Sequence, residues 1–214
     1  MSDKALFITF EGPEGAGKST QIKLLRDFLI AQGRSVVVTR EPGGTPLAEE
    51  FRDIVKHYQG EEPLYPATEL LLFEAARAQH VRFVIEPALK KGAVVLCDRF
   101  IDSTVAYQGA GRALDMQFLR ELNNFAIDKC KPDLTLLFDL PVEVGLARAA
   151  RRAANVVDFN DRLEEEKIDF HHRVRQSYLD IARNEPQRVK VLDAVLSIDE
   201  LFEKVKEHVQ RVLP

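Results

Sequence analysis

The chain has 214 residues, of which 45% are hydrophobic and 30% are charged, a composition typical of one globular domain. Its formal net charge of −4 argues against a protein that coats nucleic acid, because such proteins usually present a basic face. Since no apolar run approaches the roughly 20 residues of a membrane helix, we expect a cytoplasmic protein that binds neither nucleic acid nor membrane.

The first half of the chain alternates strand and helix patterns. Ala5–Phe10 is a short apolar run that predicts a buried strand, and the helix that follows it ends at Gly33. Ser35–Thr39 predicts a second strand. Helices are then expected at about Leu47–Tyr58 and Ala67–Lys91.

The second half repeats this alternation. Further strands are predicted at Ala93–Cys97, Leu134–Phe138 and Val189–Leu192. Further helices are predicted at Asp115–Lys129, from Pro141 onward, at Arg162–Arg183 and at Ile198–Val212. Apolar strands that alternate with helices indicate a parallel sheet covered on both faces. We therefore expect a three-layer α/β fold with a five-stranded parallel sheet flanked by helices, as one domain over 1–214 with a small lid at about 148–162.

The turn after the first strand fits the pattern G-x-x-x-x-G-K-[ST] at Gly12–Ser19. Glycines let such a loop wrap tightly, so that its backbone N–H groups and the following helix N-terminus point at phosphate oxygens. Lys18 can reach the β- and γ-phosphates of ATP, and the Ser19 hydroxyl can ligate Mg²⁺. The flanking strand and helix argue against a chance glycine-rich turn. The expected ATP-binding residues are Gly12, Pro13, Glu14, Gly15, Ala16, Gly17, Lys18, Ser19 and Thr20.

A phosphate-binding loop alone fits a kinase, a GTPase, a motor ATPase or a simple nucleotide binder. No guanine-reading N-K-x-D occurs in the chain, and the third strand ends in Asp98-Arg99 rather than in two acidic residues. Asp98 can hold Mg²⁺, partly through water, while the fork of donors on Arg99 matches an acceptor phosphate. This strand end favours a kinase whose acceptor already carries a phosphate.

Five segments together resemble thymidylate kinases. They are EGPEGAGKST at 11–20, TREPGGT at 39–45, DRF at 98–100, AYQG at 106–109 and PDLT at 132–135, and they keep the family's order from residue 5 to about 192. The resemblance implies a P-loop kinase fold and the reaction dTMP + ATP → dTDP + ADP with Mg²⁺, in dTTP biosynthesis. It also implies a homodimer.

The resemblance implies a thymine site on two segments. Phe73 would stack on the base, and Arg77, four residues later on the predicted helix, would donate to O4. Thr104 and Gln108 would hydrogen-bond the base, and Tyr107 would pack where a ribose 2′-OH would lie. Spacing alone favours Phe73 as a core residue and Arg77 as an exposed arginine, and only the resemblance reverses this. The alternative for 104–108 is a polar loop with one anchoring tyrosine.

Other implied residues surround the phosphates. Arg40 and Glu41 precede a Pro-Gly-Gly loop beside the acceptor phosphate, although that loop could have a purely structural role. Arg99 is the stronger candidate for direct contact with the phosphate. Glu11 either holds Mg²⁺-bound water and positions the acceptor, or simply caps the turn that follows its strand.

The phosphate-binding loop has no basic residue at its variable positions, so the resemblance implies that the lid supplies a catalytic cation. The candidates are Arg148, Arg151 and Arg152, with Arg162 at the lid end. The alternative is a favourable cluster of cations at a helix C-terminus. Which arginine contacts the transferred group stays open, because the segment 153–160 is longer and more apolar than the family's lid.

Two other functions remain open. A kinase for another nucleoside monophosphate would differ at the base-reading positions. A regulatory module that senses ATP without transfer is disfavoured by the intact Lys18, Asp98 and Arg99.

Overall fold

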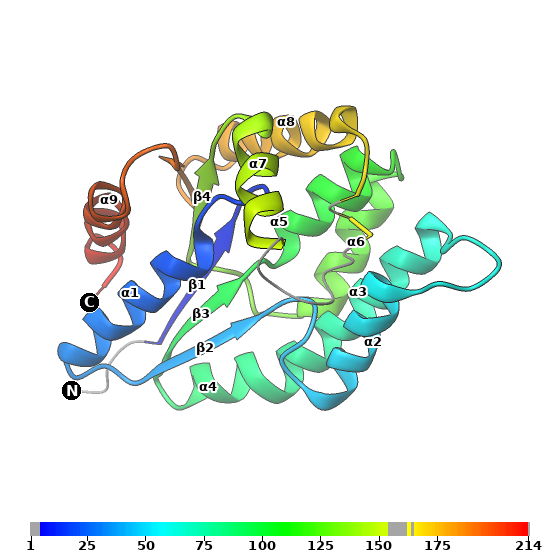
Figure 1. Cartoon of the computed structure of the whole chain (residues 1–214). Coiled ribbons are helices and arrows are strands. Elements are labelled where there is room, and N and C mark those ends of the chain that lie inside the picture. Colours follow the sequence, from blue (N-terminus) through cyan, green and yellow to red (C-terminus); the bar gives the residue numbers. More distant parts are fainter. Residues whose placement is uncertain (1–4, 154–161, 164, 214) are drawn as a thin grey trace.

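A five-stranded parallel sheet forms the centre of the molecule in the computed structural model, which describes residues 5–153, 162–163 and 165–213 (Figure 1). The strand order is β2-β3-β1-β4-β5, and every neighbouring pair is parallel. The strands are β1 (Leu6–Glu11), β2 (Val36–Arg40), β3 (Val94–Asp98), β4 (Leu134–Asp139) and β5 (Val189–Asp193). The predicted fold class and all five predicted strands are confirmed.

Helices fill the connections between the strands. Those of the described chain are α1 (Lys18–Ala31), α2 (Pro46–His57), α3 (Pro66–His80), α4 (Glu86–Lys90), α5 (Ile101–Thr104), α6 (Met116–Ile127), α7 (Val142–Ala153), α8 (Ile168–Asn184) and α9 (Ile198–Gln210), with two π-helical turns, η1 (Val81–Ile85) and η2 (Val105–Gly111). No helix among the described residues is both long and apolar enough to cross a membrane.

The side chains of β1 show why the protein has three layers. Leu6, Ile8 and Phe10 pack on one face of the sheet against α1 and α9. Phe7 points to the other face, where it packs with η1, α4 and the end of α6. Because β1 is buried on both faces, its sequence is mostly apolar rather than alternating.

Two helical segments differ from the predictions, and a third, left open between helix and loop, is helical. The helix expected over Ala67–Lys91 is interrupted by η1, just before Pro87, which has no N–H to donate to the carbonyl four residues earlier. The open segment, 101–111, forms α5 and η2. The helix expected from Arg162 begins only at Ile168, because the backbone and side chain of Arg162 are bonded to α2 and α3 instead.

The strand order places the functional segments. β1 lies beside β3 with Phe10 opposite Asp98, so the glycine-rich loop after β1 and Arg99 after β3 leave the same edge of the sheet. β2 lies on the other side of β3 with Arg40 opposite Asp98. The carboxyl ends of these three strands therefore meet at one place.

Candidate active site

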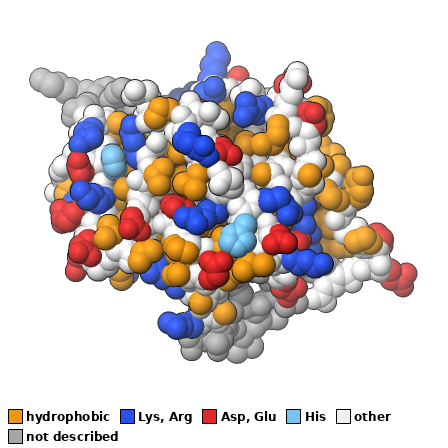
Figure 2. Space-filling model, turned by 90° about the horizontal axis from the view of Figure 1, so that it is seen from above, with side chains coloured by type: hydrophobic (Ala, Val, Ile, Leu, Met, Phe, Trp, Pro, Cys, Tyr) orange, Lys and Arg blue, Asp and Glu red, His pale blue; other side chains and the backbone are white. Residues whose placement is uncertain are grey.

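A cavity of about 530 Å³ opens at the carboxyl ends of β1, β2 and β3. Most of the site residues predicted from the sequence line it, and they come from all of the predicted site segments. They are Glu14, Gly15, Ala16, Gly17, Lys18, Ser19, Thr20, Arg40, Glu41, Phe73, Arg77, Asp98, Arg99, Thr104, Tyr107, Gln108 and Arg148. On the outer face seen in Figure 2, Lys and Arg side chains are scattered among acidic and apolar ones. Inside the cavity, five arginines and two lysines converge.

At two positions the glycine-rich loop has no space for a side chain and also adopts a positive φ angle, which favours glycine. Gly12 has φ 132°, and a Cβ there would lie 2.3 Å from the Phe138 carbonyl oxygen. Gly15 has φ 71°, and a Cβ there would lie 2.3 Å from the Gly145 carbonyl oxygen on α7. The loop is therefore wedged between the end of β4 and the first turns of α7, and only glycine fits at both contacts.

Lys18 begins α1 and folds back across the loop. Its Nζ donates to the carbonyls of Gly12 at 3.1 Å and Pro13 at 3.0 Å. Burial lowers the pKa of this ammonium, and the nearby charge of Arg99 lowers it further. The cation is thus held by backbone oxygens at the lip of the loop, where phosphate oxygens can replace them.

Ser19 and Asp98 are brought together by the pairing of β1 and β3. The Ser19 Oγ donates to Asp98 Oδ2 at 3.2 Å. Both oxygens belong to types that Mg²⁺ prefers, and both border the cavity beside the loop. Within the described residues no group of three or more His, Cys, Asp or Glu side chains could hold a metal ion by itself.

Arg99 sits directly after β3 with the uncommon φ of 67°, which turns its side chain into the cavity. Its guanidinium lies 4.9 Å from the centre of the Tyr107 ring, and it donates to the hydroxyls of Tyr107 at 3.0 Å and Tyr178 at 3.1 Å. It also forms an ion pair with Glu14 of the loop. Burial alone would raise the pKa of Glu14, but the charges of Arg99 and Lys18 outweigh it and lower the pKa to about 2. Glu14 is therefore an anion that Arg99 already holds.

Glu11, at the end of β1, lies behind the cavity rather than on its wall. Its carboxylate accepts from the Phe100 amide at 2.7 Å, from the Ser103 hydroxyl at 2.6 Å and from the Tyr178 hydroxyl at 2.9 Å. Burial, and next the charge of Asp102, raise its pKa to about 7. These contacts tie Glu11 to the turn after β3, which carries Arg99, and not to the turn that follows its own strand.

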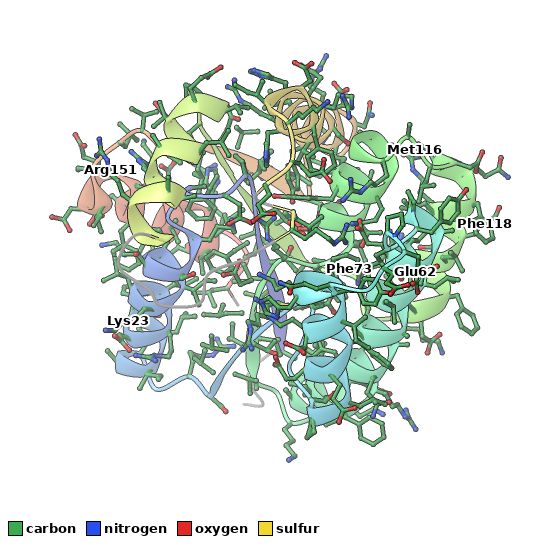
Figure 3. All side chains as sticks on the ribbon, turned by 45° about the vertical axis from the view of Figure 1, so that its right-hand side comes forward. Lys23, Glu62, Phe73, Met116, Phe118 and Arg151 are labelled. Carbon is green, nitrogen blue, oxygen red and sulfur yellow. The ribbon has the colours of Figure 1, made fainter. Side chains whose placement is uncertain are left out.

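Phe73 and Arg77 do share one face of α3, and both line the cavity. Phe73 is half-buried, and Figure 3 labels it on α3. Arg77 is buried rather than exposed, because it donates to five acceptors: Glu41 (2.8 Å), Glu74 (2.6 Å), Thr104 (2.8 Å), Asn123 (2.7 Å) and the Phe100 carbonyl (3.1 Å). The alternative of an exposed helix arginine is wrong.

Thr104, Tyr107 and Gln108 lie on α5 and η2, so the alternative of a polar loop is also wrong. All three are buried and line the cavity. Thr104 accepts from Arg77, Tyr107 accepts from Arg99, and the Gln108 amide nitrogen donates to Glu69 at 2.9 Å. Each is fixed by a charged partner.

Arg40 and Glu41 behave differently from each other. Arg40 is exposed and pairs with Glu49 at 2.8 Å. Glu41 is buried and accepts from Arg77 and, at 2.9 Å, from His80. Glu41 therefore holds the side chain of Arg77, whereas Arg40 lies at the exposed rim of the cavity.

Of the lid candidates, Arg148 is the one that the structure places on the cavity wall, where it also donates to the Ala194 carbonyl at 2.9 Å. Arg151 is exposed on α7 and does not line the cavity (Figure 3). The side chain of Arg152 and the residues 154–161 lie outside the described residues. Arg162 donates to the Val55 carbonyl at 3.2 Å and pairs with Glu69, so it is anchored to α2 and α3.

Several residues at the cavity were not predicted. Arg52 and Lys56 of α2 line it, and Arg52 donates to the Pro42 carbonyl at 2.8 Å. Their spacing of four on a predicted helix after the Pro-Gly-Gly loop was a usable signal. Tyr178 of α8 had no such signal, because only the fold brings it to Arg99.

The comparisons with known proteins agree with one another. The model of the thymidylate kinase family matches residues 10–205. The chain is 50% identical to a thymidylate kinase of Syntrophotalea carbinolica over 94% of this chain and 93% of that one, and 52% identical to one of Thermomicrobium roseum over 97% and 95%. The crystal structure of thymidylate kinase from Ehrlichia chaffeensis superposes with a TM-score of 0.77 at 33% identity, covering 96% of this chain and 99% of that one.

Proposed function

The chain belongs to the thymidylate kinase family, and from this premise we propose how its cavity is divided between the two substrates. It is an ATP-dependent phosphotransferase that moves the γ-phosphoryl group of ATP to dTMP, giving dTDP and ADP on the way to dTTP. One observation carries the division: Lys18 of the loop, Arg99 after β3 and Phe73 of α3 line the same cavity.

The donor half is the glycine-rich loop. The segment Gly12 to Thr20 wraps the ATP phosphates, all of its residues except Pro13 having a backbone N–H to donate, and Lys18 exchanges its two carbonyl partners for β- and γ-phosphate oxygens. This placement keeps the γ-phosphoryl group at the end of α1 that carries positive partial charge.

Ser19 and Asp98 are proposed to hold Mg²⁺, with Asp98 acting partly through water. They supply two oxygens that already face each other, and phosphates and water complete the shell of such an ion. When bound, Mg²⁺ neutralises charge on the β- and γ-oxygens.

The acceptor half starts at Arg99, which binds the phosphate of dTMP once Glu14 releases it. Arg52 lies on the same wall and adds a second guanidinium, while Arg40 closes the rim. Glu41 and Glu11 hold Arg77 and the Arg99 turn in place.

The base lies against Phe73, with Arg77, Thr104 and Gln108 around its polar edge. Among the described residues, Nη2 of Arg77 donates only to the Phe100 carbonyl, so that nitrogen keeps a second N–H for O4 of thymine. Tyr107 is packed against Arg99, Phe170 and Tyr178, which keeps its ring fixed where a ribose 2′-OH would have to fit.

Arg148 is the best-placed lid cation, because it lines the cavity beside the loop. As charge spreads over the transferred group, its guanidinium stabilises the transition state. Arg151 and Arg152 remain candidates for the same role from later positions of α7.

A homodimer is supported by apolar side chains on the outer sides of α3 and α6, which pack beside each other. Leu71 and Phe118 are each 55% exposed and Phe125 is 84% exposed, and Figure 3 shows Phe118 with Met116 at the edge of the molecule. A second copy would cover this patch. Sedimentation velocity of the whole chain and of Phe125→Asp tests this, since the variant should be monomeric.

The function is tested by measuring ADP release with dTMP, dUMP, CMP, UMP, AMP and GMP as acceptors. We expect the highest kcat/KM with dTMP. A higher kcat/KM with UMP or CMP would contradict the thymidylate assignment, and ATP binding without turnover of any acceptor would support the sensor alternative. Titration of dTMP into Phe73→Leu tests the proposed contact with the base. The same titration of Phe118→Leu is the matched control, because Phe118 lies on the outer surface.

A further inference from the structure

Glu69 of α3 is a fully buried carboxylate (0% exposed) just behind the cavity wall. It accepts from Gln108 Nε2 at 2.9 Å on one oxygen and from Arg112 Nη2 at 3.2 Å on the other, and it pairs with Arg162. Glu69 lies four residues before Phe73, so it belongs to the same face of α3 as the proposed base wall. Gln108 is its one partner that also lines the cavity.

The charge on Glu69 determines which way the Gln108 amide points. Burial alone would raise the pKa of Glu69, but the hydrogen bonds from Gln108 and Arg162 and the charge of Arg112 outweigh it and lower the pKa. An ionised carboxylate only accepts hydrogen bonds, so the amide nitrogen, never the oxygen, must face it. The Gln108 oxygen is therefore the end of the amide that is left for a ligand.

We propose that Glu69 is a positioning residue that fixes the Gln108 oxygen toward the base and so selects pyrimidines that carry a hydrogen on N3. The inference rests on the proposed contact between Gln108 and the base. Thymine and uracil have an N3–H that donates to the oxygen, whereas N3 of cytosine has a lone pair. Gln108 cannot rotate to suit cytosine, because its oxygen would then meet the Glu69 carboxylate.

The variant Glu69→Gln tests this directly. The introduced amide can donate as well as accept, so Gln108 becomes free to present either end. The measurement is kcat/KM for dTMP, dUMP and dCMP. We expect the ratio of dCMP to dTMP to rise about tenfold or more, the size of one hydrogen-bond mismatch, while the ratio of dUMP to dTMP stays constant because both bases carry N3–H.

Arg112→Gln is the matched control, because it removes a cation from the same carboxylate and leaves the acceptor for Gln108 intact. Its dCMP to dTMP ratio should equal that of the unmodified chain. A rise as large as in Glu69→Gln would show that general loosening, not amide orientation, sets selectivity, and would overturn the inference.

Gln108→Leu separates this inference from the function on which it rests. A normal KM for dTMP in this variant would overturn the contact with the base and the inference together. An impaired KM, combined with an unchanged dCMP to dTMP ratio in Glu69→Gln, would overturn the inference alone.

A second measurement covers the case in which Glu69→Gln does not fold. In ¹⁵N-labelled unmodified chain, the Gln108 side-chain amide protons, assigned by their loss in Gln108→Leu, should exchange slowly both with and without dTMP. Exchange at the rate of an exposed glutamine, or loss of protection when dTMP binds, would show that the amide turns and would overturn the inference.

Discussion

The donor half and the acceptor half of the cavity are built by different means. The proposed donor half is one continuous segment, 12–20, and its residues 14–20, including Lys18, line the cavity. The acceptor half takes Arg77, Arg99 and Gln108 from three separate segments. Each is held by a buried or half-buried carboxylate from a different segment than its own, namely Glu41, Glu14 and Glu69 respectively.

Because of this difference, substitutions in the two halves should affect activity and stability differently. A cation of the donor loop is bound to carbonyl oxygens, so its removal leaves no unpaired charge in the interior. Removal of a carboxylate from the acceptor half, such as that of Glu41 beside Arg77, takes a counter-charge away from a buried cluster of charges, which is destabilising. We therefore expect donor variants to be folded but inactive, and acceptor-support variants to lose stability and activity together.

The largest effect is expected for Lys18→Ala. Loss of this cation should lower kcat by roughly 10²–10³-fold, the cost of removing a preorganised charge from a transition state. The apparent Tm should stay within a few degrees of that of the unmodified chain, because the Lys18 hydrogen bonds within the described residues go to backbone oxygens and Glu14 keeps its ion pair with Arg99. Coupled ADP release and thermal unfolding measure the two values, and a large drop in Tm would break the contrast between the halves.

Glu41→Gln should have the next largest effect. Its carboxylate serves both Arg77 and His80, so we expect a loss of about 3–5 kcal/mol in the free energy of unfolding, together with a higher KM for dTMP. Urea unfolding measures the first value. Glu49→Gln is the control, since Glu49 pairs with the exposed Arg40 and should cost under about 1 kcal/mol.

Arg148→Ala and Arg151→Ala compare a cavity residue with an exposed one on the same helix. We expect kcat to fall by roughly 10–100-fold for the first and by less than about twofold for the second. Single-turnover measurements at saturating dTMP and ATP isolate this step. Equal losses in both variants would move the proposed lid role away from Arg148.

The smallest effect concerns Glu11. Its pKa is about 7 in the folded protein against 4.5 for an ordinary glutamate, so the folded state binds the extra proton and stability falls as pH rises from about 5 to 7. Relative to Glu11→Gln, this decline should amount to roughly 1–3 kcal/mol. Urea unfolding of both proteins at several pH values gives the two slopes, and parallel slopes would contradict the raised pKa.

The features that local sequence patterns form could be predicted, whereas those that depend on contacts between distant segments could not. The strands, the glycine-rich loop and Asp98-Arg99 depend on neighbouring residues, so their patterns could be recognised directly. The fate of Arg77 could not, because five acceptors from four different segments bury it. Glu69 gave no signal either, since its partners Gln108, Arg112 and Arg162 are distant in sequence.

The helical character of 101–111 shows a third kind of limit. Its sequence contains Gly109 and Gly111, which weaken any helix prediction. In the structure a Cβ on Gly109 would lie 2.4 Å from the Met116 sulfur, and one on Gly111 would lie 2.5 Å from the Phe170 ring. Tertiary packing against α6 and α8 selects glycine here, so local propensity misleads.

The contact between Gly15 and α7 explains why position 15 of the loop carries no cation. A side chain at position 15 would first meet the Gly145 carbonyl, and the next atom in its way would be the Cβ of Arg148, 3.0 Å from where its own Cβ would be. The space that a basic side chain at position 15 would need is thus already occupied by the Cβ of Arg148 on α7. A side chain at position 15 and the first turns of α7 cannot occupy the same space. A Gly15→Arg substitution would therefore have to displace α7.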